Sequence, residues 1–216
     1  TALGGITTQS SEIQPVDFTI TATTISKWKS DAADVQVISG DVTISANTTM
    51  GPAKITGNLY INTGKTLTLT GTLWVAGTFD TGSNAVVRLD SGYGGYSGIF
   101  IVDGVMQVHS NVALQGSGSA GSYLLVLGTC GPSHVPSCLL ETSPAMDVKN
   151  NVSGAILYAS EGLLEVDNNV DLVEVIAYKL LLKPGATVTY ELGLANAIFT
   201  SGPSGGVRVS GWKEVE

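Results

Sequence analysis

The sequence predicts an all-β fold, and within that class a single-stranded β-solenoid (a parallel β-helix) of right-handed sense with a short capping helix near its N-terminus. Composition is the first indication: 43% of the 216 residues are hydrophobic, only 13% are charged, and 27 are glycine. Abundant Thr, Val and Leu suit pleated strands, and glycine suits the turns between them. A β-sandwich is the structural alternative.

A weak internal repeat is the second indication. Its clearest pair aligns Tyr158 with Tyr178 and Val170 with Val188, so the spacing slips from 20 to 18 residues. Strands and corners that recur with periods of about 20 to 50 residues are typical of solenoids, propellers and sandwiches. The repeated apolar segments are NLYIN (58–62), TLWVAG (72–77), GIFIVDG (98–104), YLLVLG (123–128), GAILYASEG (154–162) and EVIAYKLLL (174–182).

The corners between strands favour the solenoid over the sandwich. They contain asparagine or glycine in the sequences TGK, HSN, KNN, DNN and KPG. These residues tolerate a left-handed backbone, which a turn from one strand to the next requires. The Asn-Gly and Asp-Gly pairs of tight hairpins are nearly absent, apart from Asp103-Gly104.

The N-terminal part is divided into an extended lead (1–23) and a capping helix (24–34). Thr24 can cap this helix, and Ile25, Trp28 and Ala32 share one face. Because an open solenoid end exposes unpaired strand edges, we expect the helix to form a lid on the first coil.

The solenoid itself is predicted for residues 35–199, followed by a glycine-rich linker and a C-terminal strand (200–216). Trp212 in this tail is expected to cover the other end or to pack back along the body. With both ends covered in this way, a monomer is favoured. The threonines at 66, 68, 70 and 72 are expected to form the solvent-facing wall of one coil, because the next strands do not repeat them as an ice-binding surface requires.

Charge and hydropathy exclude two classes of protein. The net charge is −8, and only ten basic residues are scattered along the chain, which argues against nucleic-acid binding. No apolar run approaches the roughly 20 residues of a membrane span. The N-terminus lacks Met, a basic region and an apolar region, so we expect a mature or trimmed product.

Two cysteines predict a disulfide. Cys130 and Cys138 enclose a loop that contains Pro, Gly and His134, and closing so short a loop stabilises a fold by about 2.5 kcal/mol. A metal site that includes His134 is the alternative, although it has only three nearby ligands. A disulfide implies an oxidising compartment and therefore an exported, extracellular or cell-surface protein.

Candidate ligand-binding residues are few. Glu165 and Asp167 are expected to point outward from one strand within an acidic stretch (161–174), where no Lys, Arg or aromatic platform is readable. The simplest interpretation is a solvated acidic face. Tyr93 and Tyr96, in SGYGGYSG, are expected in an exposed loop that contacts a glycan or a partner. No catalytic residue, metal site or cofactor is predicted.

Several longer segments carry a resemblance to a known group. The chain resembles exported PilX-like, pilus-assembly-associated surface proteins of Candidate Phyla Radiation bacteria. The resemblance implies a cell-surface context and an upstream membrane-anchoring helix, and it implies no catalytic residues. The matching segments are ISKWKSDA, GPAKITGNLYI, LTLTGTLWVAG, LDSGYGGYSGIFIVDG, GSAGSYLLVLGT and the tail YELGLANAIFTSGPSGGVRVSGWKEVE.

Together these observations predict a non-enzymatic, exported β-solenoid that serves as a structural or adhesive domain at the cell surface or on a pilus. Its partners would be surface glycans or proteins of the pilus and cell envelope. The alternative is a carbohydrate-binding or carbohydrate-active β-helix that uses the acidic outer face at 161–174.

Overall fold

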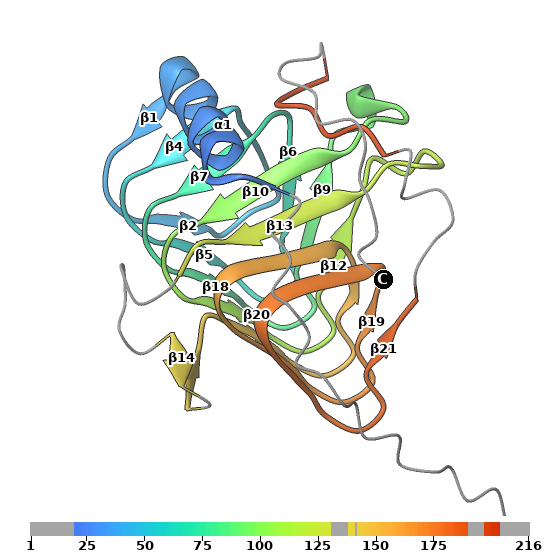
Figure 1. The fold of residues 1–216 in the computed structure, drawn as a ribbon. Coiled ribbons are helices and arrows are strands. Elements are labelled where there is room, and N and C mark those ends of the chain that lie inside the picture. Colours follow the sequence, from blue (N-terminus) through green and yellow to red (C-terminus); the bar gives the residue numbers. More distant parts are fainter. Residues whose placement is uncertain (1–19, 131–137, 141, 190–196, 204–216) are drawn as a thin grey trace, which may run out of the picture.

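The computed structural model describes residues 20–130, 138–140, 142–189 and 197–203. This part of the chain is mostly β, with one α-helix and long parallel sheets curled into a half-barrel (Figure 1). The prediction of an all-β protein with parallel sheets is confirmed at this level. Within the described ranges, no helix combines the length and apolar character needed to cross a membrane.

The larger sheet has twelve strands, which lie in two rows. The first row contains β1 (Val37–Ile38), β4 (Ala53–Ile55), β7 (Leu73–Val75), β10 (Gly98–Val102) and β13 (Leu124–Gly128). The second row contains β2 (Val42–Ile44), β5 (Leu59–Ile61), β8 (Phe79–Thr81), β11 (Met106–Val108) and β16 (Met146–Val148). Two long strands extend through both rows, namely β18 (Ile156–Val166) and β20 (Glu174–Leu182).

The smaller sheet has seven strands and forms the third row. It contains β3 (Thr48–Met50), β6 (Thr66–Leu69), β9 (Val86–Leu89), β12 (Ala113–Gln115), β17 (Ser153–Gly154), β19 (Asp171–Leu172) and β21 (Thr187–Val188). A separate antiparallel hairpin, β14 (Leu139–Leu140) with β15 (Ser143–Pro144), is inserted between β13 and β16.

Pairing between strands follows one rule over the first repeats: each strand pairs in parallel with the strand three places later in the chain. Thus β4 pairs with β7, β5 with β8 and β6 with β9. Three successive strands, one from each row, therefore form one repeat. The described long sheets do not contain the antiparallel, hairpin-linked layers that the β-sandwich alternative requires.

Five of the six segments that the sequence analysis treated as equivalent lie in the same row. The segments that begin at 72, 98, 123, 154 and 174 supply the first-row strands β7, β10, β13, β18 and β20. The segment at 58 was assigned wrongly, because it supplies β5 of the second row. The first-row member of that repeat is β4, whose short Ala-Lys-Ile sequence gives a weak signal.

The register between the last two repeats also differs from the prediction. Tyr158 pairs with Ile176, 18 residues later, and Leu163 pairs with Lys179, 16 residues later. The offset between the two repeats shortens by two residues along the strand, as predicted. Each offset is, however, two residues smaller than predicted: 18 and 16 in place of 20 and 18. A two-residue shift keeps every side chain on the same face, so matching the tyrosines gave a plausible but wrong alignment.

The main hydrophobic core lies between the three rows. Alternate side chains of each short strand point inward, as in β5, where Leu59 and Ile61 are buried and Tyr60 is half-buried. The five residues of β10 and the five of β13 are all buried. These two strands therefore have apolar side chains on both faces, and their outer face needs a cover.

Asparagines form the corners between the second and third rows. Asn84, Asn111, Asn151 and Asn169 have φ values of 59°, 60°, 60° and 55°. The backbone amides of the first three bond to the next repeat, as from Asn111 N to Asn150 O, and Asn151 Nδ2 donates to Asn111 Oδ1 at 3.0 Å. The predicted left-handed corners are confirmed.

Replacing Asn111 by alanine is expected to lower the free energy of unfolding by about 1 to 2 kcal/mol, because alanine is strained in the left-handed region. Urea unfolding followed by circular dichroism measures this loss. Asn111→Gly is the control, since glycine accepts the positive φ of 60° and loses only the exposed side-chain bond. Equal losses in both variants would contradict the backbone explanation.

The helix α1 spans Ala22–Val35, slightly beyond the predicted 24–34. Its N-cap is Thr21 rather than the predicted Thr24. Thr21 has an extended backbone, and its Oγ1 accepts a hydrogen bond from Thr24 N at 3.2 Å. The predicted apolar face is confirmed, because Ile25, Trp28 and Ala32 are buried.

The position of α1 differs from the predicted lid on the first coil. Trp28 packs in a second hydrophobic cluster with outward side chains of the first row, including Ile101 of β10 and Leu127 of β13. A helix of 14 residues is about 21 Å long, enough to cross five strands that span about 19 Å. The helix therefore covers the apolar outer side of the first row, as Figure 1 shows, and not the end of the stack.

A segment near the C-terminus lies along the same side. Phe199 belongs to the cluster that contains Trp28, and Thr200 N donates to Ser97 O at 2.9 Å. Further along, Thr72 N donates to Ser201 O at 2.9 Å. The predicted tail 204–216, with Trp212, lies outside the described residues.

The predicted threonine wall is wrong in part. Thr66 and Thr68 lie on β6, but Thr68 is only 9% exposed because Arg88 of the neighbouring strand donates from Nε to its Oγ1 at 3.2 Å. Thr72 lies beyond the corner at Gly71 and is fully buried. The row therefore does not form a continuous solvent-facing surface.

Candidate functional site on the outer face of the second row

A line of polar side chains crosses the outer face of the second row. Asp80, Gln107, Asp147 and Glu165 occupy the same register position on β8, β11, β16 and β18. Their neighbours in sequence, such as Met146 beside Asp147, belong to the main core. Because side chains alternate along a strand, this line faces away from the core.

Two lysines pair with the carboxylates at one end of this line. Lys183 Nζ lies 2.5 Å from Glu165 Oε1 and 2.7 Å from Asp167 Oδ1. Lys149 Nζ lies 2.8 Å from Asp147 Oδ2 and 3.6 Å from Asp167 Oδ2. We call the five residues Asp147, Lys149, Glu165, Asp167 and Lys183 the ion-pair cluster.

The ion-pair cluster corrects the sequence-based expectation of a solvated acidic face. Glu165 is only 7% exposed. The cationic partners of Glu165 and Asp167, which the sequence analysis did not identify, come from neighbouring repeats. Lys149 follows β16, and Lys183 follows β20. Parallel stacking brings these residues beside Asp167, although they are distant from it in sequence.

The neighbouring carboxylates raise the pKa of both lysines. Hydrogen bonds to Asp167 and Glu165 raise the pKa of Lys183 above its ordinary value of 10.5. Burial lowers the pKa of Lys149, but the hydrogen bond and charge of Asp147 outweigh burial and raise it. Both lysines therefore hold their protons more tightly than an isolated lysine and stay as cationic partners in the cluster. A general acid for glycoside cleavage must instead be a carboxyl group that holds a proton.

A small pocket adjoins the ion-pair cluster, beside the inserted hairpin. Its volume is about 330 Å³, and its lining contains the hydroxyl, amide and carboxylate side chains of Thr78, Gln107, Thr142, Ser143 and Asp147, with Val105 and Pro144. Asp147 Oδ1 is buried and has no hydrogen-bond partner among the described residues. This pocket was not apparent from the sequence, because the hairpin insertion creates one of its walls.

The two tyrosines predicted on an exposed loop lie elsewhere. Tyr93 ends the short 3-10 helix η1 (Ser91–Tyr93), is 1% exposed and belongs to the main core. Tyr96 is half-buried and packs against the same core. The prediction of exposed loop tips is wrong for Tyr93, because its large apolar ring is turned into the core. Neither tyrosine lies in the pocket at Asp147.

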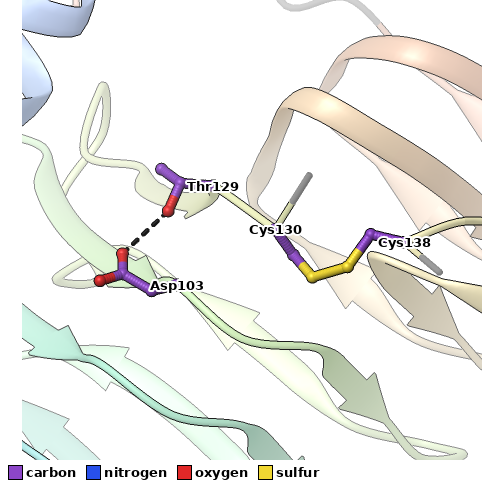
Figure 2. The surroundings of a disulfide bond; sticks show 4 residues. All are labelled: Asp103, Thr129, Cys130 and Cys138. Carbon is purple, nitrogen blue, oxygen red and sulfur yellow. Dashed lines mark hydrogen bonds between the residues drawn. A yellow bond between two sulfur atoms is a disulfide. The ribbon is translucent and has the colours of Figure 1, made fainter. Parts of the chain in front are cut away.

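Cys130 and Cys138 lie at disulfide distance, with their Cα atoms 6.0 Å apart. Figure 2 shows the bond between their sulfur atoms and, beside it, the hydrogen bond from Thr129 Oγ1 to Asp103 Oδ1, at 2.8 Å. Both cysteines are buried. His134, the third ligand of the alternative metal site, lies outside the described residues; within them no group of three or more potential metal ligands occurs.

Replacing Cys130 and Cys138 together by serine is expected to lower the free energy of unfolding by about 2.5 kcal/mol, the value for closing a short loop. Guanidinium unfolding of the oxidised protein, the reduced protein and the double variant measures this loss. Reduced protein and the double variant should have nearly the same stability. An unchanged midpoint after complete reduction would contradict a stabilising disulfide.

Comparison with models of protein families, with curated proteins and with solved structures finds no match for this chain. The resemblance to PilX-like surface proteins therefore remains a proposal, and the site must be judged on its own geometry.

A second cleft lies between the start of α1 and the outer side of the first row. It has a volume of about 550 Å³, and its lining includes Ile25, Lys29, Tyr158 and Glu161. Tyr158 Oη donates to Ile20 O at 3.0 Å, which fixes the chain where it enters the helix. Burial raises the pKa of Tyr158 to about 12, although the bond to Ile20 opposes this shift.

Stability is expected to fall above about pH 10. Tyr158, Tyr93, Lys149 and Lys183 all have a raised pKa in the folded state, so the folded protein binds their protons more tightly than the unfolded chain does. Their contribution is complete below the ordinary values near 10 and is lost as the pH rises through the folded values. Urea unfolding at pH 7 to 12 measures this, and Tyr158→Phe should reduce the alkaline loss. A free energy of unfolding that stays constant up to pH 12 would contradict the assignment.

Proposed function

We propose that this chain is a three-sided, right-handed β-solenoid that serves as an exported, non-enzymatic structural or adhesive module at a cell surface or on a pilus. Support for the solenoid comes from the pairing of each strand with the strand three places later and from one core that extends from Ile44 to Leu172. The resemblance to PilX-like proteins suggests the cellular context.

The observation that carries the structural role is the ion-pair cluster. Glu165 and Asp167, the strongest acidic candidates in the sequence, contact Lys149 and Lys183 from the neighbouring repeats. Each contact joins one repeat to the next across the outer face. Charges used in this way stabilise the wall of a stack rather than provide a free acid and base for catalysis.

Export is supported by the buried cysteine pair at disulfide distance, since disulfides persist mainly in oxidising compartments. The low charge content, 13%, also fits a module whose surface relies on Thr, Ser and Asn. Such a surface suits many weak polar contacts.

Two measurements test the proposed function. Antibodies against the purified protein should label intact source cells, and a panel of polysaccharides should remain uncleaved. Labelling only after cell lysis would contradict a surface location. Hydrolysis that is lost in Glu165→Gln but kept in the matched helix variant Asp31→Asn would contradict a non-enzymatic role.

A second candidate, carbohydrate binding, rests on the pocket at Asp147. Its buried Oδ1 lacks a donor among the described residues, and Gln107, Thr78 and Thr142 supply further polar groups suited to hydroxyls. A glycan array followed by calorimetry tests this candidate. Binding that Asp147→Asn weakens at least tenfold, while Asp31→Asn leaves it unchanged, would support it; a silent array would remove it.

A further inference from the structure

Three apolar side chains of the last repeat point toward the core side of their strands but are exposed to solvent. Each of the three pairs in register with a residue of the preceding repeat whose side chain is almost completely buried, at 0%, 0% and 1% exposure. The residues of the last repeat are instead 43%, 46% and 41% exposed. The three pairs are Leu180 over Leu164, Leu182 over Val166, and Val188 over Leu172.

We call this surface the core end; it consists of the inward side chains of β20 and β21. The described segments that were expected to cover the ends of the stack do not lie on it. The helix α1 packs on the outer side of the first row through Trp28, and residues 197–203 lie along the side at Ser97 and Thr72. The expectation of a monomer depended on two covers: α1 does not serve as one, and the tail with Trp212 lies outside the described residues.

The opposite end of the stack is also incomplete. Among the residues that the structure describes, β1, β2 and β3 each pair with one neighbour only, namely β4, β5 and β6. Their inward residues Ile38, Val42 and Met50 are half-buried and pack against the core from one side. This first end therefore presents three strand edges and three incompletely buried apolar side chains.

The two ends match each other in shape and chemistry. At the core end β20 spans the first two rows and β21 forms the third, whereas the first end has one strand in each row. All rows are parallel, so the first repeat of one copy can continue the hydrogen-bonding direction of the last repeat of another. A single peptide strand can pair with only one row. Covering Leu182 of the second row and Val188 of the third row together requires a partner that presents strands to more than one row, as the first repeat of this chain does.

We propose that the core end binds the first repeat, β1 to β3, of a second copy of this chain. The contact is head-to-tail, so a third copy can add in the same manner and a linear row of copies forms. This inference needs the parallel stacking of the strands but does not depend on a cell-surface or pilus location. Its main attraction is apolar, so association should persist at high salt.

Sedimentation velocity of the full chain from about 5 to 500 μM tests association over micromolar dissociation constants. Wild type should form dimers and longer species as concentration rises. Leu182→Lys should remain monomeric, because it places a charge on the core end. Leu181→Lys is the matched control: Leu181 pairs with Glu165 on the outward face of the same strand, and association should be unchanged.

Mixing two blocked variants tests the head-to-tail arrangement. Val42→Lys blocks the first end and Leu182→Lys blocks the core end, so each alone should be monomeric and an equimolar mixture should form dimers but nothing longer. Circular dichroism checks folding, and Met50→Lys replaces Val42→Lys if the latter unfolds. A wild type that stays monomeric at every concentration, or dimers of Val42→Lys alone, would overturn the proposal.

Discussion

Replacing Trp28 by alanine is expected to lower the free energy of unfolding by about 4 kcal/mol, the typical loss for a fully buried aromatic side chain. Trp28 has no exposed surface and packs against the outer side of the first row with Ile101 and Leu127. Its removal leaves a cavity beneath α1. The outer faces of β10 and β13 would then lose the contact that keeps them from water.

Urea unfolding of Trp28→Ala measures this effect, and Trp28→Phe should cost clearly less because the ring fills part of the cavity. Lys27→Ala is the surface control on the same helix; its side chain is 54% exposed, and the change should stay within about 0.5 kcal/mol. A loss below about 1 kcal/mol in Trp28→Ala would mean that the helix does not stabilise the sheet.

Replacing Asp103 by alanine is expected to cost about 3 kcal/mol, because it removes one partner of a largely buried ion pair. Lys29 Nζ lies 2.6 Å from Asp103 Oδ1, and the two side chains are only 18% and 13% exposed. Asp103 also accepts hydrogen bonds from Thr129 Oγ1 at 2.8 Å, shown in Figure 2, and from Trp74 Nε1 at 2.9 Å. The variant leaves all three donors without this partner.

A double-mutant cycle identifies the source of this loss. Lys29→Met removes the charge that Asp103→Ala would leave uncompensated, so the double variant should be more stable than the sum of the single losses predicts. Thr129→Val, which removes one hydrogen bond, should cost only about 1 kcal/mol. Strict additivity of the Lys29 and Asp103 changes would contradict an anchor between helix and sheet.

The features best predicted from the sequence were those that neighbouring residues determine by themselves, namely the backbone conformation of the corners and the apolar face of the helix. Asn111 and Asn151 indicated left-handed corners because few other residues accept a positive φ, and both have a φ of 60°. The spacing of Ile25, Trp28 and Ala32 indicated a helix because the apolar face of a helix is also determined locally, by the spacing of residues in the sequence.

The position of the helix depends on residues from several repeats and was missed. Yet β10 and β13 contained a usable signal, because their five consecutive residues do not alternate and are all buried. Strands of this kind need a cover on each face. The one predicted helix was available to provide it.

The candidate site was found only in part for a similar reason. Glu165 and Asp167 were recognised, whereas Lys149 and Lys183 were not recognised as their partners. Lys149 precedes Asp167 by 18 residues, and Lys183 follows it by 16, which are the offsets of the strand register. Applying the repeat to charged residues as well as to apolar ones would have placed both lysines beside Asp167.

The pocket at Asp147 and the burial of Tyr93 were beyond the reach of the repeat. The pocket depends on how the inserted hairpin packs. The burial of Tyr93 depends on the turn at η1, where the side chain of Asp90 accepts a hydrogen bond from Gly92 N at 2.8 Å. Insertions do not obey the period of the strands that they interrupt. Their contacts are therefore set by tertiary packing.

Nuclear Overhauser effects between backbone protons test the parallel stacking of repeats most directly. Stacking predicts cross-strand contacts in parallel register between distant segments, such as Val108 with Val148 and Val86 with Ala113. Antiparallel contacts between strands that are neighbours in sequence, such as β8 with β9, would contradict it.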